Sequence, residues 1–529
     1  LGGRDATWLA IGASIFASNI GSEHLIGLAG AGASSGMAMA HWEIQGWMIL
    51  ILGWVFVPFY TRSMVYTMPE FLERRYNPQS RTILSVISLV SYVLTKVAVT
   101  VYAGGLVFQQ VFGIKELWGI DFFWIAAIGL VVLTALYTIF GGMKSVLYTS
   151  VLQTPILLLG SLIILVLGFK ELGGWDEMMR VCGAVTVNDY GDTMTNLIRS
   201  NDDANFPWLG ALIGSAIIGF WYWCTDQFIV QRVLSGKNEM EARRGTIFGA
   251  YLKLLPVFLF LIPGMIAFAL HQKYIGAGGE GFLPMLANGT ANADAAFPTL
   301  VAKLLPAGVK GLVVCGILAA LMSSLASLFN SSAMLFTIDF YKRFRPETPE
   351  KKLVGIGQIA TVVIVILGIL WIPIMRSVGD VLYTYLQDVQ SVLAPGIAAA
   401  FLLGICWKRT SAQGGMWGLI AGMIIGLTRL GAKVYYSNAG EVADSTFKYL
   451  FYDMNWLFFC GWMFLFCIIV VIVVSLATEA PTAEKIQGLV FGTATKEQKA
   501  ATRASWDHWD IIHTVIILAI TGAFYWYFW

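Results

Sequence analysis

The stretch of sequence that decides the fold is residues 11–30, IGASIFASNIGSEHLIGLAG. The run is apolar at both ends and long enough to cross a bilayer core of about 30 Å as a helix. Its middle carries polar side chains and a glycine, from Ser18 to His24. Backbone groups at membrane depth must be hydrogen-bonded, so an unwound stretch persists there only where it lines a cavity or binds something. The run therefore predicts a broken membrane helix with a site at the break.

A second apolar run is interrupted in a similar way five spans later, at residues 221–227, WYWCTDQ. A unit of five spans reverses its orientation when it is repeated, because an odd number of crossings returns the chain to the opposite side. Two interrupted helices with this spacing favour an inverted repeat, which is the architecture of many secondary transporters.

The composition agrees with a membrane protein. Of the 529 residues, 57% are apolar and 12% are charged, against about 25% charged in an ordinary soluble domain, which excludes a water-soluble globular enzyme. Counting apolar runs of roughly 20 residues gives thirteen candidate spans. They lie near 8–37, 39–61, 82–112, 121–140, 146–169, 208–232, 245–271, 308–341, 353–375, 380–406, 414–431, 455–478 and 511–529. We therefore expect an all-α polytopic membrane protein.

The distribution of charge orients the chain. The net charge is only +2 and no basic block is large enough to bind nucleic acid, so we expect no nucleic-acid partner. Lysines and arginines gather in the loops that share a side with Leu1, whereas acidic residues gather in the loop 170–207. The positive-inside rule places the first side in the cytoplasm and the loop outside.

Ionisable residues inside spans are costly and are candidates for function. The carboxylate of Glu43 can accept hydrogen bonds from two neighbouring hydroxyls, and Lys253 offers three donors, so together they suit a neutral polyol. The aromatic cluster 220–223 supplies rings that cover the apolar C–H faces of a sugar. Gln387 adds an amide, although an isolated glutamine in a span is more often a helix–helix contact.

A pair of hydroxyls suggests an ion site. Ser323 and Ser324 stand side by side in the eighth span. Hydroxyls alone more often bond to a carbonyl one turn back along the helix. A hard monovalent cation needs several oxygens, and carbonyls released by the unwinding near Ala17 and Ile20 could complete such a set.

These motifs resemble those of the sodium:solute symporters, along the whole chain. The resemblance lies in residues 11–30, in Tyr137–Ser145 and in Trp221–Gln227, and the segments Tyr222–Gln227 and Phe401–Arg409 are most similar to the sodium/glucose cotransporter branch. The resemblance implies a LeuT-type core of two inverted five-helix repeats with broken first and sixth helices, plus C-terminal helices. The family usually has fourteen spans, so we expect that one helix preceding residues 1–8 is absent from this chain.

The resemblance also implies site residues. A sodium ion would bind to the carbonyls of Ala17, Ile20 and Ala320 and the hydroxyls of Ser323 and Ser324. Sugar would contact Asn19, His24, Glu43, Trp223, Lys253 and Gln387, with Tyr222 as the inner gate and Tyr383 as the outer gate. Two positions depart from the pattern: Gly219 stands where related sugar transporters have Asn or Thr, and Ser150 stands where several members have an Asp associated with a second sodium. We therefore expect a single sodium.

The sequence thus predicts four segments: residues 1–169 as the first repeat, 170–207 as an extracellular loop, 208–406 as the second repeat and 407–529 as peripheral helices. The expected function is sodium-coupled import of a neutral hexose of the glucose or galactose type by alternating access, in the plasma membrane (the inner membrane of the cell). We expect no enzymatic activity, because no phosphate-cradling loop or nucleophile elbow occurs. Alternatives are another solute, such as myo-inositol, another polyol or an organic anion, and a sodium- or sugar-responsive sensor or channel. The oligomeric state stays open.

Overall fold

Helices make up nearly all of the regular structure in the computed structural model, which describes residues 4–21, 23–286, 289–378, 382–438 and 443–529. In the first part of the chain they are α1 Trp8–Asn19, α2 Ala29–Ser35, α3 Ala40–Glu43, α4 Gly46–Ile51, α5 Val57–Ser63, α6 Met68–Arg75, α7 Pro78–Ser91, α8 Ala98–Phe112, α9 Phe122–Leu172 and α10 Trp175–Gly183. The middle part contains α11 Trp208–Gly219, α12 Gln227–Leu234, α13 Glu239–Leu252, α14 Ile262–Gly276, α15 Ala296–Leu304, α16 Ala307–Met334, α17 Lys342–Phe344, α18 Glu350–Val378 and α19 Leu382–Cys406. The last part contains α20 Ala412–Asn438, α21 Thr446–Lys448, α22 Trp456–Ala477, α23 Ala483–Ile486, α24 Lys496–Ala504 and α25 His508–Tyr527.

Widened π-helical turns interrupt several of these helices. They are η1 Glu23–Leu28, η3 Leu52–Phe56, η4 Tyr92–Val97, η5 Phe220–Thr225, η6 Val257–Leu261, η8 Leu335–Tyr341 and η9 Tyr449–Asp453. Two tighter 3₁₀ turns are η2 Gly36–Met39 and η7 Ala293–Ala295, and β1 Glu116–Leu117 pairs antiparallel with β2 Ile120–Asp121 in a small hairpin. π-helical turns are frequent at functional sites, and two of them, η1 and η5, directly adjoin the interruptions expected from the sequence.

Both interruptions are present. Helix α1 ends at Asn19, and Ile20 is extended (φ −81°, ψ 103°) before the chain becomes helical again in η1. The other break follows η5, where Asp226 is extended (φ −75°, ψ 129°) and its side chain accepts a hydrogen bond from the backbone N–H of Phe228. That bond caps α12, because a carboxylate at the N-cap satisfies an orphan N–H group of the first turn. The prediction of two broken helices is confirmed.

The spans expected at 121–140 and 146–169 differ from expectation, because they form one continuous helix, α9. Its 51 residues correspond to about 77 Å at 1.5 Å per residue, more than twice the bilayer core. The signals that begin and end a helix stand at its two ends, Asp121 as N-cap and Gly173 with φ 114°. Gly141 and Gly142, in the gap between the two expected spans, lower helix propensity but do not by themselves end a helix. Ser150, on which the expectation of one sodium rests, belongs to the part of α9 whose side chains are not described.

The helices are those of a multi-pass integral membrane protein. Within the described residues, eleven helical runs are long and apolar enough to cross a membrane, and Trp8–Asn19 and the first part of α9, Phe122–Leu136, are shorter apolar stretches. Outward-facing side chains on these runs are themselves apolar: Ile359 and Leu370 on α18 are 66% and 65% exposed, and Trp462 on α22 is 63% exposed. Apolar surface of this extent is typical of contact with lipid.

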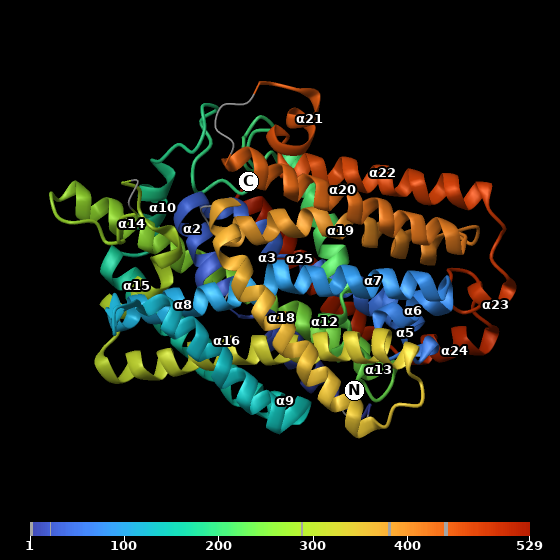
Figure 1. Cartoon of the computed structure of the whole chain (residues 1–529). Coiled ribbons are helices and arrows are strands. Elements are labelled where there is room, and N and C mark those ends of the chain that lie inside the picture. The colour runs from blue at the N-terminus through green and yellow to red at the C-terminus, as the bar shows by residue number, and fades with distance from the viewer. Residues whose placement is uncertain (1–3, 22, 287–288, 379–381, 439–442) are drawn as a thin grey trace.

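Different segments of the chain lie at the two ends of the helix bundle. Figure 1 shows α6, α23 and α24 at one end of the long helices and α10, α14 and α15 at the other. The first end holds segments that the charge distribution assigns to the cytoplasm, and the second holds part of the loop assigned to the outside. A site at the breaks of α1 and α12 therefore lies between the two ends.

Candidate functional site

A small cavity lies between the interrupted helices. It has a volume of about 30 Å³ and is lined by Asn19, Glu23, His24, Trp42, Glu43, Gln45, Ile218, Gly219, Tyr222, Trp223, Lys253, Tyr383, Leu386, Gln387 and Gln390. All six residues expected to contact sugar, and both expected gate tyrosines, are in this set. The structure therefore brings together side chains from five separate stretches of the chain.

Glu43 is the centre of the polar network in this cavity. It is the last residue of α3, and it is only 1% exposed. Its Oε2 lies 2.6 Å from Lys253 Nζ and 3.1 Å from His24 Nε2, and its Oε1 accepts a hydrogen bond of 2.5 Å from the Tyr383 hydroxyl. A buried carboxylate is stable only when paired and hydrogen-bonded, and here three side chains satisfy that requirement.

A second set of polar contacts surrounds Tyr222. Its hydroxyl donates to Asn19 Oδ1 (3.2 Å) and accepts from Lys96 Nζ (3.3 Å). Lys96 also pairs with Glu23 at 3.3 Å and lies 4.6 Å from the centre of the Tyr222 ring. Tyr222 belongs to the broken sixth span and Asn19 to the broken first span, so this hydroxyl links the two breaks directly.

Several cavity residues were not among the predicted ligands. They include Trp42, Gln45 and Gln390, of which Gln390 follows Gln387 by three positions and so shares its helix face. Trp42 Nε1 and Gln387 Oε1 are buried and find no hydrogen-bond partner among the described residues. Buried polar groups normally have hydrogen-bond partners, so a polar solute in the cavity can supply the partners that these two atoms lack. The spacing of the two glutamines was the signal that could have identified Gln390.

The predicted sodium ligands lie on two segments that are in contact. The Ser324 hydroxyl is buried and has no hydrogen-bond partner among the described residues. It lies against the break of the first span, since a Cβ added at Gly21 would be 2.5 Å from Ser324 Oγ. Ser323 and Ala320 are 4% and 6% exposed on the same helix, α16. An orphaned hydroxyl beside the carboxyl end of a helix, where the last carbonyls lack helical partners, fits a sodium ion.

Ala17 and Ile20, the other two predicted ligands, belong to that helix end. Ala17 is in the last turn of α1 and Ile20 is its C-cap. A second small cavity, lined in part by Gly21 and Ser324, shares Asn19 with the first cavity. The candidate ion site and the candidate solute site therefore adjoin.

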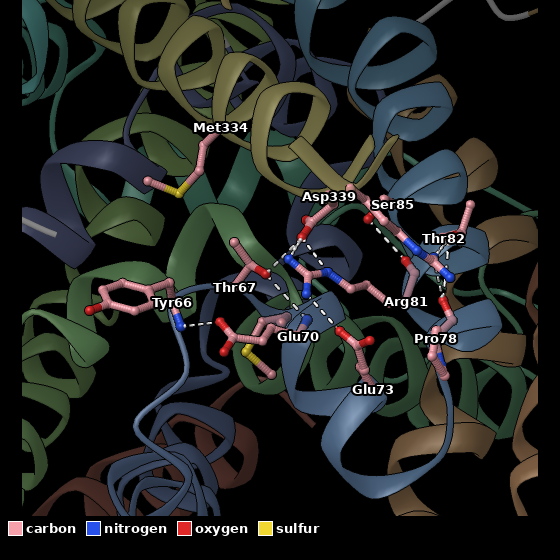
Figure 2. A network of polar contacts seen from close by, with 12 residues as sticks. Tyr66, Thr67, Glu70, Glu73, Pro78, Arg81, Thr82, Ser85, Met334 and Asp339 are labelled. Carbon is pink, nitrogen blue, oxygen red and sulfur yellow. Dashed lines mark hydrogen bonds and ion pairs between the residues drawn. The ribbon is translucent and has the colours of Figure 1, made fainter. Parts of the chain in front are cut away.

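A partly buried ionic network, shown in Figure 2, surrounds α6 at the end assigned to the cytoplasm. Arg81 contacts Asp339 at 2.6 Å and Glu73 at 2.6 Å, and the Thr67 hydroxyl donates to Asp339 at 3.3 Å. Thr67 caps α6, Glu73 lies on α6, Arg81 on α7, and Asp339 on η8. The short helix α6 is thereby tied to the ends of two long helices.

Helix α6 also contacts the broken sixth span. The side-chain carbonyl of Gln227, the first residue of α12, accepts a hydrogen bond of 2.7 Å from Met68 N. This hydrogen bond joins the start of α6 to the start of α12.

At the opposite end, Asp294 joins two elements near Tyr383, the expected outer gate. Both of its carboxylate oxygens lie 3.3 Å from the backbone N of Leu382, the first residue of α19. A Cβ added at Gly30 of α2 would lie 2.6 Å from Asp294 Oδ1, so the carboxyl also packs on the outer half of the first span. Burial raises the pKa of Asp294 to about 7, and the hydrogen bond from Leu382 offsets part of this effect.

Replacing this carboxyl should change how stability depends on pH. Below the ordinary pKa of 3.8 the group is protonated in both states. Between there and about 7 the unfolded chain releases the proton and the folded chain keeps it, so stability falls as pH rises. Asp294→Asn should show a flatter melting profile in detergent and a higher Tm at pH 8, whereas Asp202→Asn in the exposed outer loop should match the wild type. An unchanged pH profile for Asp294→Asn would contradict this assignment.

The model of the sodium:solute symporter family matches residues 1–426. This chain belongs to the sodium:solute symporter family. The symporter is 37% identical over 506 residues to human sodium/myo-inositol cotransporter 2, covering 93% of the chain and 74% of the relative. It is 39% identical over 497 residues to the sodium/glucose cotransporter 1 of Ovis aries, covering 90% of the chain and 74% of the relative.

The solved structure of another protein shares the fold of the symporter. The match is a Na⁺-coupled sialic acid symporter in a substrate-bound outward-open state, with a TM-score of 0.67, 22% sequence identity, and coverage of 91% of this chain and 92% of that one. The predicted LeuT-type fold is confirmed. The symporter is a transporter rather than an enzyme, and sodium is its coupling ion.

Proposed function

We propose that this symporter imports a neutral polyol, a hexose of the glucose or galactose type, together with one sodium ion across the plasma membrane. The observation that carries the proposal is the paired state of Glu43, whose carboxylate is bound by Lys253, His24 and Tyr383 inside the cavity. Such a group exchanges hydrogen bonds with an uncharged solute without leaving a charge unpaired.

The pairing disfavours an organic anion. An anion would need a cation whose charge is uncompensated, but Lys253 lies 2.6 Å from Glu43 and Lys96 lies 3.3 Å from Glu23. Taking Lys253 from Glu43 would leave a buried carboxylate alone, which is strongly unfavourable, and taking Lys96 from Glu23 would leave a largely buried one alone. A hydroxyl, in contrast, can donate to Glu43 and accept from Lys253 while the ion pair persists.

The size of the cavity indicates what must move when solute binds. Its volume of about 30 Å³ is far below the roughly 300 Å³ at which small-molecule pockets begin. Tyr383 is 3% exposed and its hydroxyl occupies one oxygen of Glu43. A solute hydroxyl that takes over this oxygen would release Tyr383, so arrival of the polyol and movement of the outer gate are one event.

Aromatic rings complete the proposed solute site. Trp223 and Tyr222 pack edge to face with ring centres 4.9 Å apart, and the Lys253 ammonium lies 5.3 Å from the centre of the Trp223 ring. Trp223 thus joins an apolar surface to the charged network. A sugar ring, with hydroxyls at its edge and C–H groups on its face, matches that combination.

Coupling would follow from the contact between the two candidate sites. Sodium bound by the carbonyls of Ala17, Ile20 and Ala320 and the hydroxyls of Ser323 and Ser324 would tie the first span to α16. If this favours the state in which the solute site is formed, each ligand raises the affinity for the other by the same factor. The membrane potential adds about 2.3 kcal/mol per charge per 100 mV, which drives inward transport of a neutral solute with sodium.

A second candidate solute is myo-inositol. Human sodium/myo-inositol cotransporter 2 is among the similar relatives, and Gly219 departs from the Asn or Thr that the resemblance to sugar transporters leads us to expect at this position. Both solutes are neutral six-membered rings with hydroxyls, so the arguments from charge apply equally to them. Competition between them decides which one the cavity prefers.

Uptake by the purified protein tests the proposal. Proteoliposomes with an inward sodium gradient should accumulate radiolabelled glucose, galactose or myo-inositol, and collapse of the gradient should abolish accumulation. Unlabelled solutes, including organic anions, should then be compared as competitors. Accumulation without sodium, or stronger competition by an anion than by any polyol, would contradict the proposal. Saturable binding without uptake would indicate a sensor, and flux that does not saturate would indicate a channel.

A further inference from the structure

Gly219 and Gln45 occupy the same part of the cavity wall. Gly219 is the last residue of α11, and Gln45 lies two residues after Glu43, in the short non-helical step between α3 and α4. A Cβ added at Gly219 would lie 2.4 Å from Gln45 Oε1, 2.9 Å from Cδ and 3.1 Å from Nε2. The whole amide group therefore covers the α-carbon of Gly219, and no side chain fits at position 219 while Gln45 stays in place.

One hydrogen bond fixes the direction of this amide. Gln45 Nε2 donates to the backbone oxygen of Ser215, one turn before Gly219 on α11, at 2.8 Å. The residue is 2% exposed and lines the solute cavity. With the NH₂ group directed at Ser215, the side-chain carbonyl oxygen is the end of the amide that is left to accept a hydrogen bond.

We propose that Gln45 is a specificity-determining residue, whose Oε1 accepts a hydrogen bond from one hydroxyl of the solute. This inference rests on the proposed function, because it assumes a neutral polyol in the cavity. The amide would supply, from the adjoining segment of the same wall, the polar contact that glycine at 219 cannot make. Positions 45 and 219 then form an exchangeable pair, in which one long polar side chain at either position fills the same space.

The proposal predicts a distinct pattern of solute preference. An acceptor built into a buried site discriminates against analogues that lack the hydroxyl, because its own hydrogen bond is then lost. One monodeoxy analogue of the preferred hexose or inositol should therefore compete at least tenfold less well than the parent compound. The variant Gln45→Ala should bind the parent more weakly and should no longer discriminate against that analogue, while its discrimination against the other deoxy positions should persist.

Reciprocal substitution tests the pairing of the two positions. Gly219→Asn alone should lower kcat/KM for uptake at least tenfold, since the new side chain displaces the Gln45 amide. Adding Gln45→Ala to Gly219→Asn should restore most of the loss, because the asparagine amide then has the space. The matched control is Gly219→Asn with Gln390→Ala, which removes another cavity glutamine and should restore nothing.

Thermal stability gives a readout that does not depend on transport. Gly219→Asn should lower the Tm of the detergent-purified protein, and Gln45→Ala should restore it in the double variant. If Gly219→Asn is equally active and stable with and without Gln45, or if no deoxy analogue loses discrimination in Gln45→Ala, the inference is overturned. If the wild type transports no polyol but the Tm rescue is seen, the proposed function fails while the packing of this pair holds.

Discussion

Replacing Glu43 by glutamine should reduce sodium-driven polyol uptake more than a hundredfold. The substitution removes the charge that pairs with Lys253 at 2.6 Å and weakens the acceptor for Tyr383 and His24. Breaking a buried pair by removing one partner costs about 3–5 kcal/mol, and each 1.4 kcal/mol is about tenfold in an equilibrium constant. Initial rates of uptake in proteoliposomes at saturating sodium, over a range of polyol concentrations, measure the loss.

Two comparisons separate binding from folding in this experiment. Glu43→Gln combined with Lys253→Met removes both buried charges, so the Tm should recover while uptake stays lost, because the hydroxyl-binding groups are gone. Glu177→Gln removes a carboxylate from an exposed pair with Arg180, and exposed pairs contribute little, so this variant should transport like the wild type. Uptake by Glu43→Gln within threefold of the wild type would contradict a solute site centred on this carboxylate.

The main features of the fold could be predicted from the sequence, because they depend on local patterns. The breaks at Asn19 and Asp226 follow from polar residues and glycine inside apolar runs, a pattern that is typical of unwound backbone lining a cavity at membrane depth. The continuous α9 could not be foreseen in the same way. Whether a helix runs on through weak helix formers depends on the contacts of the whole helix, and no local signal of the sequence reports them.

The candidate site was predictable only in part, for a related reason. Side chains with unusual chemistry for a membrane span, such as Glu43 and Lys253, are conspicuous in a sequence. Their pairing, over 210 residues, is a property of the packed structure. Gln45 is not conspicuous, because an amide near a helix end is common, and its role depends on a glycine 174 positions away that leaves space for it. The contact between Arg81 and Asp339 across 258 residues escaped prediction for the same reason.

Replacing Ser324 by alanine should raise the sodium concentration needed for half-maximal uptake at least tenfold. The hydroxyl is buried, lacks a hydrogen-bond partner among the described residues and lies against Gly21 at the break of the first span. A contact between a polar group and a charge contributes about 1.5–3 kcal/mol, which corresponds to roughly ten- to a hundredfold in affinity. Sodium titrations of uptake, and of intrinsic tryptophan fluorescence without solute, measure the shift independently of transport rate.

Ser332 provides the matched control for this experiment, and linkage provides a second check. Ser332 lies on the same helix, α16, and its hydroxyl is also buried without a partner among the described residues, but it is eight residues from Ser324, so Ser332→Ala should leave the sodium curve unchanged. If sodium and polyol stabilise the same state, Ser324→Ala should weaken polyol binding at low sodium and restore it at saturating sodium, because coupling is reciprocal. A sodium curve for Ser324→Ala that matches that of Ser332→Ala would remove this hydroxyl from the ion site. A polyol affinity that falls equally at all sodium concentrations would place Ser324 in the solute site instead.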